Sequence, residues 1–513
     1  MAMPLPVEDG PNTDEARRAV TILNRLADEL RRREPETTKR LDYYKGKHRL
    51  CYASPEFRDY FADRFTGFSD NWTAPVAAAP AERMNVLGIR LPGEQTADKD
   101  LSEAWKVADC ERGSSEAFVV MLAAARAYCL VWGNPVDEDE PRVTWERPDQ
   151  AIVGYDSETG RASAALKLWS DDTTEYATLY TPADVWKFSR PRYARNGYSV
   201  SGLIVPAGSD VVRSAGPEGW LPRQGASDDT WPIPNPMGRV PMVELRNQTL
   251  LDDDPISDIA GVMAMQDAIN LVWSYLLNAL DFASLPQRVV MGTDVPQIPI
   301  LDDQGQVVGK RPLELDTLIN ERILWIPGEN AKVSSWPAAD LSAYSSVIER
   351  AIEHIAAQTR TPPHYLIGKV ANLSAEALTA AETGLVSKTG ERIVYSNSGI
   401  RDINSLMASA MNDEPKAKAC RRGAVLWADT QFRALGQKVD ALMKMKTIGF
   451  PLEWIAEQYG LEPPEVARVM RMVEVQAEMD PVNQMLNGGA QPSQATPAQP
   501  GEDPFAVEPE PVG

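Results

Sequence analysis

Two long amphipathic segments that flank a small insert constrain this chain more than any other feature. Residues 254–283 open with Asp-Pro, which is typical of a helix cap followed by a first-turn proline, and continue with apolar residues at helical spacing. At 1.5 Å per residue, this helix should be roughly 40 Å long. Residues 340–359 repeat the pattern, with Asp340 as the expected cap. Residues 286–339 hold short strand-like pieces, RVVMG and ILWIPG, between Gly and Pro turns. The pattern predicts a helical hairpin whose two legs carry a small insert.

The first quarter of the chain has mostly helical patterns. A helix is predicted over residues 14–33, where Pro35 should end it, and a short second helix should stop at Gly46. Residues 101–132 are also expected to be helical, with a break around Gly113. The apolar run that ends this stretch is shorter than the roughly 20 residues needed to cross a bilayer, so we interpret it as a buried helix.

The next hundred residues change from helical to β character. Residues 143–250 contain β-branched and aromatic runs separated by turn residues, which predict strands. One long loop, at about residues 190–236, is rich in Gly, Ser and Pro. Residues 1–253 are therefore interpreted as one N-terminal region with a helical part and a mostly β part.

A very long helix is expected after the second amphipathic segment. Residues 374–412 contain no proline and place apolar residues on one face, whereas Gly384, Gly390 and Gly399 each cost about 1 kcal/mol relative to Ala and make a bend plausible. A β segment, AVLWADTQF, follows and completes residues 374–436.

The two ends of the chain differ from its middle. Residues 437–480 predict short helices, and residues 481–513 contain seven Pro, four Gly and neither Lys nor Arg, so we expect this tail to be disordered. The N-terminal residues lack a basic stretch followed by an apolar run, which predicts no signal peptide and a cytosolic chain.

The charge balance restricts the possible functions. The chain carries 52 Lys+Arg and 73 Asp+Glu, a net charge of −21, and this argues against a protein that grips nucleic acid over its whole surface. Four Cys without a CxxC pair and three His provide no basis for a disulfide framework or a structural zinc site. We expect no cofactor and no metal.

Several short motifs resemble catalytic signatures only in part. The run GQVVGK at residues 305–310 has one residue too few between its glycines for a phosphate loop, and Arg311 stands where Ser or Thr should bind magnesium. The run GYSVSG at residues 197–202 lacks a glycine that a nucleophile elbow needs. We interpret both as loops without catalytic function.

Two further motifs match part of the β-lactamase signature. Ser69-Asp70-Asn71 and Lys388-Thr389-Gly390 are both present, but SxxK is absent, and the second motif lies inside the predicted long helix instead of a strand. Coincidence explains the pair better than catalysis.

Two charged clusters are weighed in the same way. The acidic run at residues 137–140 could attract calcium, but a solvated acidic turn is the simpler interpretation. Arg190, Arg192 and Arg195 with Tyr193 form a modest basic-aromatic patch, for which an ordinary exposed loop is favoured. Carboxylates are abundant, yet no spacing singles out a catalytic pair.

The order of these segments resembles the portal proteins of tailed double-stranded DNA bacteriophages, of the long-tailed type found in phages of actinobacterial hosts. The stretches that carry the resemblance are LDYYKGKHRL (41–50), FSDNWTAPVAAAPAERMNVLGIRL (68–91), NPMGRVPMVELRNQ (235–248), DPISDIAGVMAMQDAINLVWSYLLNALDFASLPQR (254–288) and TPPHYLIGKVANLSAEALTAAETGLVSKTGER (361–392). None is a catalytic signature, so their combination and order carry the specificity.

The resemblance implies a portal fold with a helical stem, a small α/β clip, a mixed α/β wing and a helical crown. The implied parts are stem helices at residues 254–285 and 340–359, a clip and return strand at 286–339, a tunnel loop at 360–373, a wing helix and β segment at 374–436, and a crown at 437–480. In the tunnel loop, the candidate DNA-facing residues are Arg360, His364 and Lys369, with Arg360 or Lys369 touching phosphates transiently. Pairing with neighbouring acids is the alternative for these cations.

The resemblance also implies a function and a set of partners. Twelve copies should form a ring at one capsid vertex, with double-stranded DNA passing through the channel during packaging and ejection. The expected partners are the terminase large subunit, the major capsid and scaffolding proteins, and a head-completion or adaptor protein, with no membrane. Such a chain would be a non-enzymatic virion component that assembles in the host cytoplasm. The alternatives are a cytosolic hydrolase with an unrecognised carboxylate site and another structural head protein, such as a capsid subunit.

Overall fold

In the computed structural model the chain is an α+β protein whose residues divide into two units, 1–435 and 436–513. The structure describes residues 14–47, 68–137, 139–191, 220–223, 230–251, 254–284, 288–291, 297–301, 306–312, 323–326, 332–335, 341–367, 375–431, 435–461 and 463–479. The long loop expected at residues 190–236 lies mostly outside these ranges, as does the expected tail at 481–513. Each unit is described by itself below.

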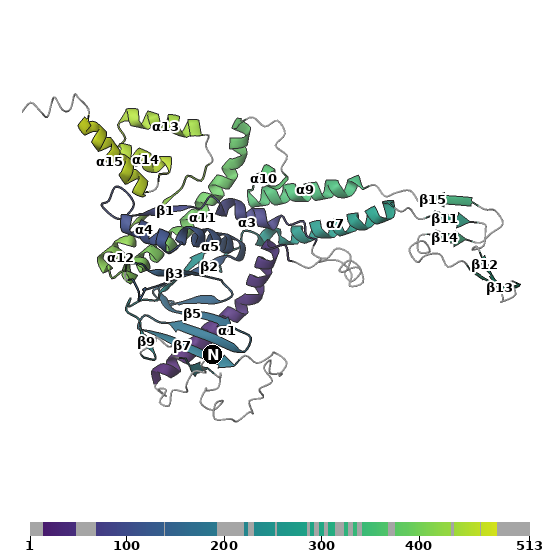
Figure 1. Cartoon of the computed structure of the whole chain (residues 1–513), viewed down its shortest axis with the longest axis horizontal. Coiled ribbons are helices and arrows are strands. Elements are labelled where there is room, and N and C mark those ends of the chain that lie inside the picture. The colour runs from purple at the N-terminus through teal and green to yellow at the C-terminus, as the bar shows by residue number, and fades with distance from the viewer. Residues whose placement is uncertain are drawn as a thin grey trace, which may run out of the picture. The chain divides into compact units, whose positions relative to one another are not determined.

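An N-terminal helix, α1 (Asp14–Tyr44), packs on one face of an antiparallel sheet (Figure 1). The strands of this sheet are β4 (Ala151–Tyr155), β5 (Ala162–Ser170), β6 (Thr174–Tyr180), β7 (Asp184–Pro191) and β8 (Leu221–Pro222), with β9 (Ile233–Pro234) also paired to β7. Leu23, Leu26 and Leu30 of α1 share a buried apolar cluster with Ile152 and Leu166 of the sheet. These strands confirm the β character that the sequence predicts.

Pro35 does not end the first helix, contrary to the sequence-based expectation, and α1 continues through it to Tyr44. The buried residues Leu30, Thr37 and Leu41 keep the helical spacing on both sides of the proline. Burial of this uninterrupted face outweighs the hydrogen bond that proline removes. Gly46 does follow the helix end, with φ +69°, as predicted.

A second antiparallel sheet lies at the centre of the first unit. Its order is β10 (Met242–Arg246), β2 (Arg126–Trp132), β3 (Arg142–Glu146), and α5 (Cys110–Ala124) packs against it. The prediction that residues 101–132 are helical throughout is wrong in its last part, because Arg126–Trp132 is a strand. Ala125 ends α5 with a left-handed φ of 76°. Strand β2 lies in the middle of its sheet and is largely buried, so its sequence is a continuous apolar run. It therefore lacks the alternation of apolar and polar residues that identifies a strand in a sequence.

The break in this helical region also lies earlier than expected. Helix α4 (Lys99–Val107) ends before Asp109, whose φ of 51° is left-handed, and Gly113 lies inside α5. The small helix α3 (Thr73–Ala81) also packs on α5. Gly113 is needed there for close packing, because a Cβ at this position would lie 2.2 Å from the Trp145 indole.

The long predicted helix is present as α11 (Ala375–Ala410), which contains 36 residues and runs unbroken through its three glycines. It packs against β10, β2 and α3. Helix α12 (Glu414–Cys420) follows and was not predicted. Asp413 caps it by accepting a hydrogen bond from the Lys416 amide at 2.9 Å, and Pro415 lies in its first turn. The expected β segment is β16 (Ala424–Trp427), which pairs with β1 (Val86–Arg90).

The two amphipathic segments form helices that lie side by side (Figure 1), preceded by a short 3-10 turn, η1 (Ala260–Val262). They are α7 (Met263–Ser284) and α9 (Ser342–Thr359). Asp254 does not cap the first helix as predicted, because its carboxylate pairs with Arg126 at 2.5 Å and the chain turns helical only at η1. The predicted cap Asp340 lies outside the described residues.

The insert between these helices is built from short strands. In the described part, β11 (Arg288–Met291) pairs parallel with β14 (Ile323–Ile326) and antiparallel with β15 (Lys332–Ser335), while β12 (Gln297–Leu301) and β13 (Val307–Pro312) form an antiparallel pair. The strand-like pieces RVVMG (288–292) and ILWIPG (323–328) that the sequence indicates contain β11 and β14.

In its described residues, the second unit contains three helices, as expected from the sequence: α13 (Leu435–Ile448), α14 (Leu452–Tyr459) and α15 (Pro463–Met479). Gly460 ends α14 with a φ of 102°, and α14 packs on α15. Among the described residues of either unit, no helix combines the length and apolar character that membrane spanning requires.

One buried carboxylate connects the start of the α7 segment to the middle of α11. The Asp258 side chain is 1% exposed and lies 3.0 Å from Lys388 Nζ and 3.0 Å from Arg392 Nε, and the Asn247 side-chain amide donates to it at 2.8 Å. Burial lowers the pKa of Lys388, and the charge of Asp258 opposes this shift. The cluster therefore depends on Asp258 as the counter-charge of two buried cations.

Replacing this carboxylate by an amide tests that dependence. Asp258→Asn leaves Lys388 and Arg392 buried without their shared counter-charge, so the free energy of unfolding should fall by about 3–5 kcal/mol. The measurement is urea unfolding followed by tryptophan fluorescence. Asp28→Asn is the matched control, because Asp28 pairs with Arg31 on the exposed face of α1, and it should change stability by less than about 0.5 kcal/mol. Equal effects of the two variants would contradict this role for Asp258.

Two glycines inside helices should respond oppositely to alanine. Gly113→Ala forces a methyl group into the Trp145 ring and should lower the unfolding temperature, with a cost of about 1–3 kcal/mol. Gly390→Ala in α11 meets no atom within 4 Å and should stabilise by about 1 kcal/mol through helix propensity. Thermal unfolding of both variants checks the packing, and a stabilised Gly113→Ala would show that the α5–β3 contact is loose.

Candidate functional site

Arg360 terminates α9 at the base of the paired helices. Its φ of 54° is left-handed, and the Thr361 amide then donates to the Ala356 carbonyl at 3.0 Å, which closes the helix end. The Arg360 side chain is 57% exposed, and its Nη1 lies 3.6 Å from Glu391 Oε2 on α11. A half-exposed pair at this distance is weak, so the guanidinium remains available to another anion.

His364 lies on α10 (Pro363–Ile367), the short helix that follows, but in a different environment. Its side chain is only 13% exposed, and Nε2 lies 3.8 Å from Glu382 Oε1. Glu382 also pairs at 3.5 Å with Arg83, which is buried and donates to the Tyr365 hydroxyl at 2.7 Å. His364 therefore belongs to an enclosed polar cluster.

The structure thus separates the candidate residues of the predicted tunnel loop. Arg360 is exposed beside one carboxylate, His364 is enclosed beside another, and Lys369 lies outside the described residues. Arg360 is the described residue of the three that has access to solvent and to a passing polyanion.

The helix pair leaves apolar side chains in solvent. Tyr275 and Leu280 of α7 and Val347 of α9 are all exposed, although each lies on a helix whose opposite face is buried. Exposed large apolar residues that cluster on one element mark an interaction surface more often than scattered ones do.

The Ser69-Asp70-Asn71 motif holds α7 in place. The Gln266 side chain accepts from the Trp72 amide at 2.7 Å, the Asn270 side chain accepts from the Asp70 amide at 3.1 Å, and the Trp273 indole donates to the Asp70 carboxylate at 2.6 Å. The second motif of the β-lactamase pair lies within α11, where Lys388 is bound to Asp258. Both motifs therefore have structural roles.

The other motifs and charged clusters singled out in the sequence show no catalytic arrangement among the described residues. Most of GQVVGK belongs to strand β13, which rules out a phosphate loop there, and GYSVSG lies outside the described residues. Arg190 pairs with Glu175 at 2.6 Å and stacks on Trp220, so its guanidinium already has partners within the chain. Asp137, Asp139 and Glu140 line a shallow acidic pocket, and no group of His, Cys, Asp or Glu in the described ranges is arranged to hold a metal ion.

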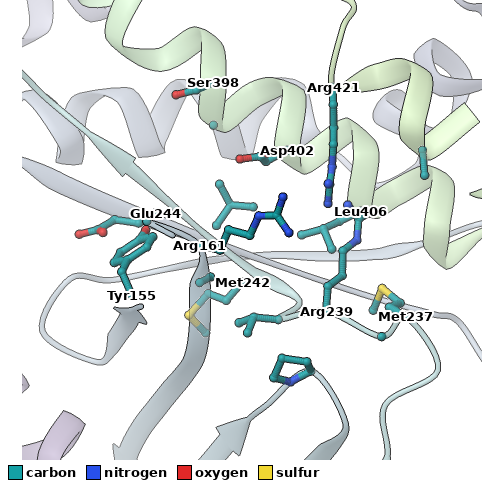
Figure 2. A pocket seen from close by; sticks show the side chains of 18 of the residues that line it. Tyr155, Arg161, Met237, Arg239, Met242, Glu244, Ser398, Asp402, Leu406 and Arg421 are labelled. Atoms are coloured by element: carbon teal, nitrogen blue, oxygen red, sulfur yellow. The ribbon is translucent and has the colours of Figure 1, made fainter. Parts of the chain in front are cut away.

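A larger cavity of about 870 Å³ lies between the β4–β5 turn, the segment before β10, and helices α11 and α12 (Figure 2). Arg161, Arg239 and Arg421 project into it, together with Asp402 of α11. Sequence reasoning missed this site because each arginine is isolated in its own segment and only the fold brings the three together. No local spacing in the sequence signals it.

Comparisons with solved structures find chains from gene transfer agent particles at low similarity. The virion of a native gene transfer agent (GTA) particle matches with a TM-score of 0.40 and 13% identity, over 84% of this chain and 99% of the other. A structure described as the neck of native GTA particle computed with C12 symmetry matches with a TM-score of 0.38 and 12% identity, over 81% and 96% of the two chains.

The family and sequence comparisons are more informative. A family model described as "Phage portal protein, SPP1 Gp6-like" matches residues 23–467, which is most of the chain. The portal proteins of Mycobacterium phage D29 and Mycobacterium phage L5 are each 23% identical to it over 418 residues, which cover 78% of this chain and 77% of each relative. The chain therefore belongs to the SPP1 Gp6-like family of phage portal proteins.

Proposed function

We propose that twelve copies of this chain form a ring at one capsid vertex, and that the channel of this ring passes double-stranded DNA during packaging and ejection. The observation that carries the proposal is the portal-family match over residues 23–467. Portal proteins are structural rather than enzymatic, which sets aside the hydrolase alternative. A capsid subunit is disfavoured because the family match is to portal proteins, and it would leave the α7–insert–α9 hairpin without a role.

The proposed parts follow the elements of the fold. The stem is α7 with α9, the clip is the insert between them, and the tunnel loop is residues 360–373 with α10. The wing comprises α11, β16 and the preceding sheets, and the crown is α13 to α15. The chain would also dock the terminase large subunit, the major capsid and scaffolding proteins, and a head-completion protein, after assembly in the host cytoplasm.

A closed ring requires each subunit to present two different complementary faces, because its contacts run head to tail. The exposed apolar residues Tyr275, Leu280 and Val347 of the helix pair supply surface that one subunit leaves uncovered. Packing this surface against the next copy would remove it from water and stabilise the ring.

The charge of the chain suits DNA that must slide. A net charge of −21 repels phosphates and prevents the tight grip of a Lys-rich wall. The exposed residues of α9 include Glu349 and Glu353 beside Arg350. Arg360, at the end of that helix, would then provide a local and transient phosphate contact. ATP hydrolysis for packaging would come from the terminase.

The first prediction from the proposed function concerns the mass of the assembled particle. The purified protein should give a particle of about 680 kDa, twelve times the 56.5 kDa chain, with a central hole. Light scattering and negative-stain imaging measure mass and symmetry together. Val347→Asp should reduce ring formation, whereas Val136→Asp, in an exposed turn, should leave it unchanged. Rings that tolerate Val347→Asp and are lost with Val136→Asp would contradict the assigned stem contact.

The second prediction concerns the tunnel loop. Combined Arg360→Gln and Lys369→Gln should lower DNA retention in filled heads severalfold, because each neutralisation removes a phosphate partner. Retained DNA is measured after packaging in vitro, with Lys99→Gln on the exposed start of α4 as the control.

A purely structural role of Arg360 is distinguished by its partner. Glu391→Gln breaks the Arg360–Glu391 pair and leaves the arginine in place. If Arg360 contacts DNA, Glu391→Gln should retain DNA at least as well as the wild type. If it reproduces the loss seen without Arg360, the ion pair and not a DNA contact explains the effect.

A further inference from the structure

The 870 Å³ cavity between α11, α12 and the two sheets contains more cations than its own carboxylates neutralise. Figure 2 shows the guanidinium groups of Arg161, Arg239 and Arg421 directed into the same space, and Lys418 of α12 also lines it. The volume lies within the range of specific binding sites, which is about 300–1,000 Å³. The first question is whether these cations already have partners.

Arg239 is held by neutral groups. Its Nη1 donates to the Ser405 hydroxyl at 2.8 Å, and its Nη2 donates to the Ser409 hydroxyl at 2.7 Å and to the Ser405 carbonyl. Its buried Nε has no hydrogen-bond partner among the described residues. Burial and the nearby charge of Arg421 lower the pKa of Arg239. Two serine hydroxyls and one carbonyl of α11 thus fix the direction of this guanidinium, and none of them carries a charge that neutralises it.

The acidic residues of the cavity offset only part of its positive charge. Glu244 is already bound by Arg126 at 3.0 Å and by Arg246 at 2.8 Å. Glu414 accepts from the Ser409 hydroxyl at 2.9 Å. Asp402 forms no ion pair within 4.0 Å among the described residues. Burial raises its pKa, and the charges of Arg421 and Arg239 oppose this shift. Arg161, Arg421 and Lys418 likewise have no ion pair in the described part of the chain.

We propose that this cavity is an oxyanion site that receives a carboxylate from a second copy of the chain in the ring. The proposal rests on the ring proposed above. Converging arginines match a carboxylate because the planar guanidinium can donate two parallel hydrogen bonds to it. Arginine is also enriched at the centres of protein interfaces.

The charge of the chain favours a second copy over DNA as the occupant. Every copy carries 73 Asp+Glu against 52 Lys+Arg, so a neighbouring subunit has an excess of carboxylates to present. In a head-to-tail ring, the face of one subunit that holds the cavity would contact a different face of the next subunit. Duplex DNA would approach against the net charge of −21.

Lys418 allows a direct test. A carbodiimide couples an amine only to a carboxylate that lies against it, so assembled rings should yield a peptide joining Lys418 to an Asp or Glu. Rings assembled from a mixture of ¹⁴N- and ¹⁵N-labelled chains, analysed by mass spectrometry, show whether the two residues come from different copies. The expected result is a cross-link of mixed isotope composition.

Charge reversal provides the second measurement. Arg421→Glu should lower the affinity between subunits about tenfold or more and abolish the Lys418 cross-link. Arg422→Glu is the matched control, because Arg422 is the neighbouring exposed residue and does not line the cavity, and it should change neither result. Both residues are exposed, so loss of folding is not expected, and circular dichroism checks this.

The outcomes separate this inference from the proposed function. Rings that form normally with Arg421→Glu, and in which Lys418 couples only within its own chain, would overturn the inference while the portal function stands. Binding of a fluorescent DNA duplex that Arg421→Glu abolishes, without coupling between copies, would assign the cavity to phosphates and also overturn it. A protein that forms no ring under any condition would overturn both proposals.

Discussion

The burial of one carboxylate, Asp258, determines how the major parts of the first unit join. A buried charge is costly unless it is paired and hydrogen-bonded, and Asp258 meets this condition through Lys388, Arg392 and Asn247. These partners come from α11 and from the end of β10. Because Asp258 precedes η1 and α7 by only a few residues, the same contacts fix where the paired helices leave the body of the subunit.

Hydrogen bonds from buried polar residues fix the rotation of α7 about its own axis. An ordinary core helix is held by apolar contacts instead. Gln266, Asp267 and Asn270 are all buried, and they bind the Asp70–Trp72 segment and the Tyr43 hydroxyl. An apolar face tolerates sliding and rotation, whereas each of these hydrogen bonds is satisfied in one register only. Together with Asp258, they give the helix pair a defined orientation, which a ring of identical subunits requires.

The sequence predicts those elements whose signals are local. Gly46 and the α11 pattern depend on residues within one helix, and both predictions are confirmed. The predictions at Pro35, Arg126–Trp132 and Asp254 fail because the deciding interaction is distant. Helix α1 packs on the sheet through residues up to Leu30, and Tyr43 beyond the proline packs in the other apolar cluster, so burial on both sides holds the helix together. Pairing with two neighbouring strands makes the apolar run of residues 126–132 a strand, and Arg126 binds the expected cap residue.

The candidate site also depends on contacts between residues that are distant in the sequence. Sequence alone places Arg360 and His364 near a helix end, and it cannot show that Glu382 and Arg83 enclose His364. Arg83 is separated from His364 by most of the chain, so no window of sequence contains both. The cavity arginines were missed for the same reason, because Arg161, Arg239 and Arg421 meet only after three segments have packed.

Because the chain has an excess of acidic residues, a cation without a carboxylate partner indicates where an external anion could bind. Arg83, Arg126 and Arg392 are enclosed, and each pairs with an acidic residue, so they serve the fold. Arg360 is held only loosely, and Arg421 forms no ion pair within the described residues. With carboxylates abundant on the surface, an arginine that stays unneutralised indicates a position where the fold reserves positive charge for an anion outside the subunit. Under the two proposals above, Arg360 at the base of the paired helices would meet DNA, and Arg421 in the cavity would meet a neighbouring copy.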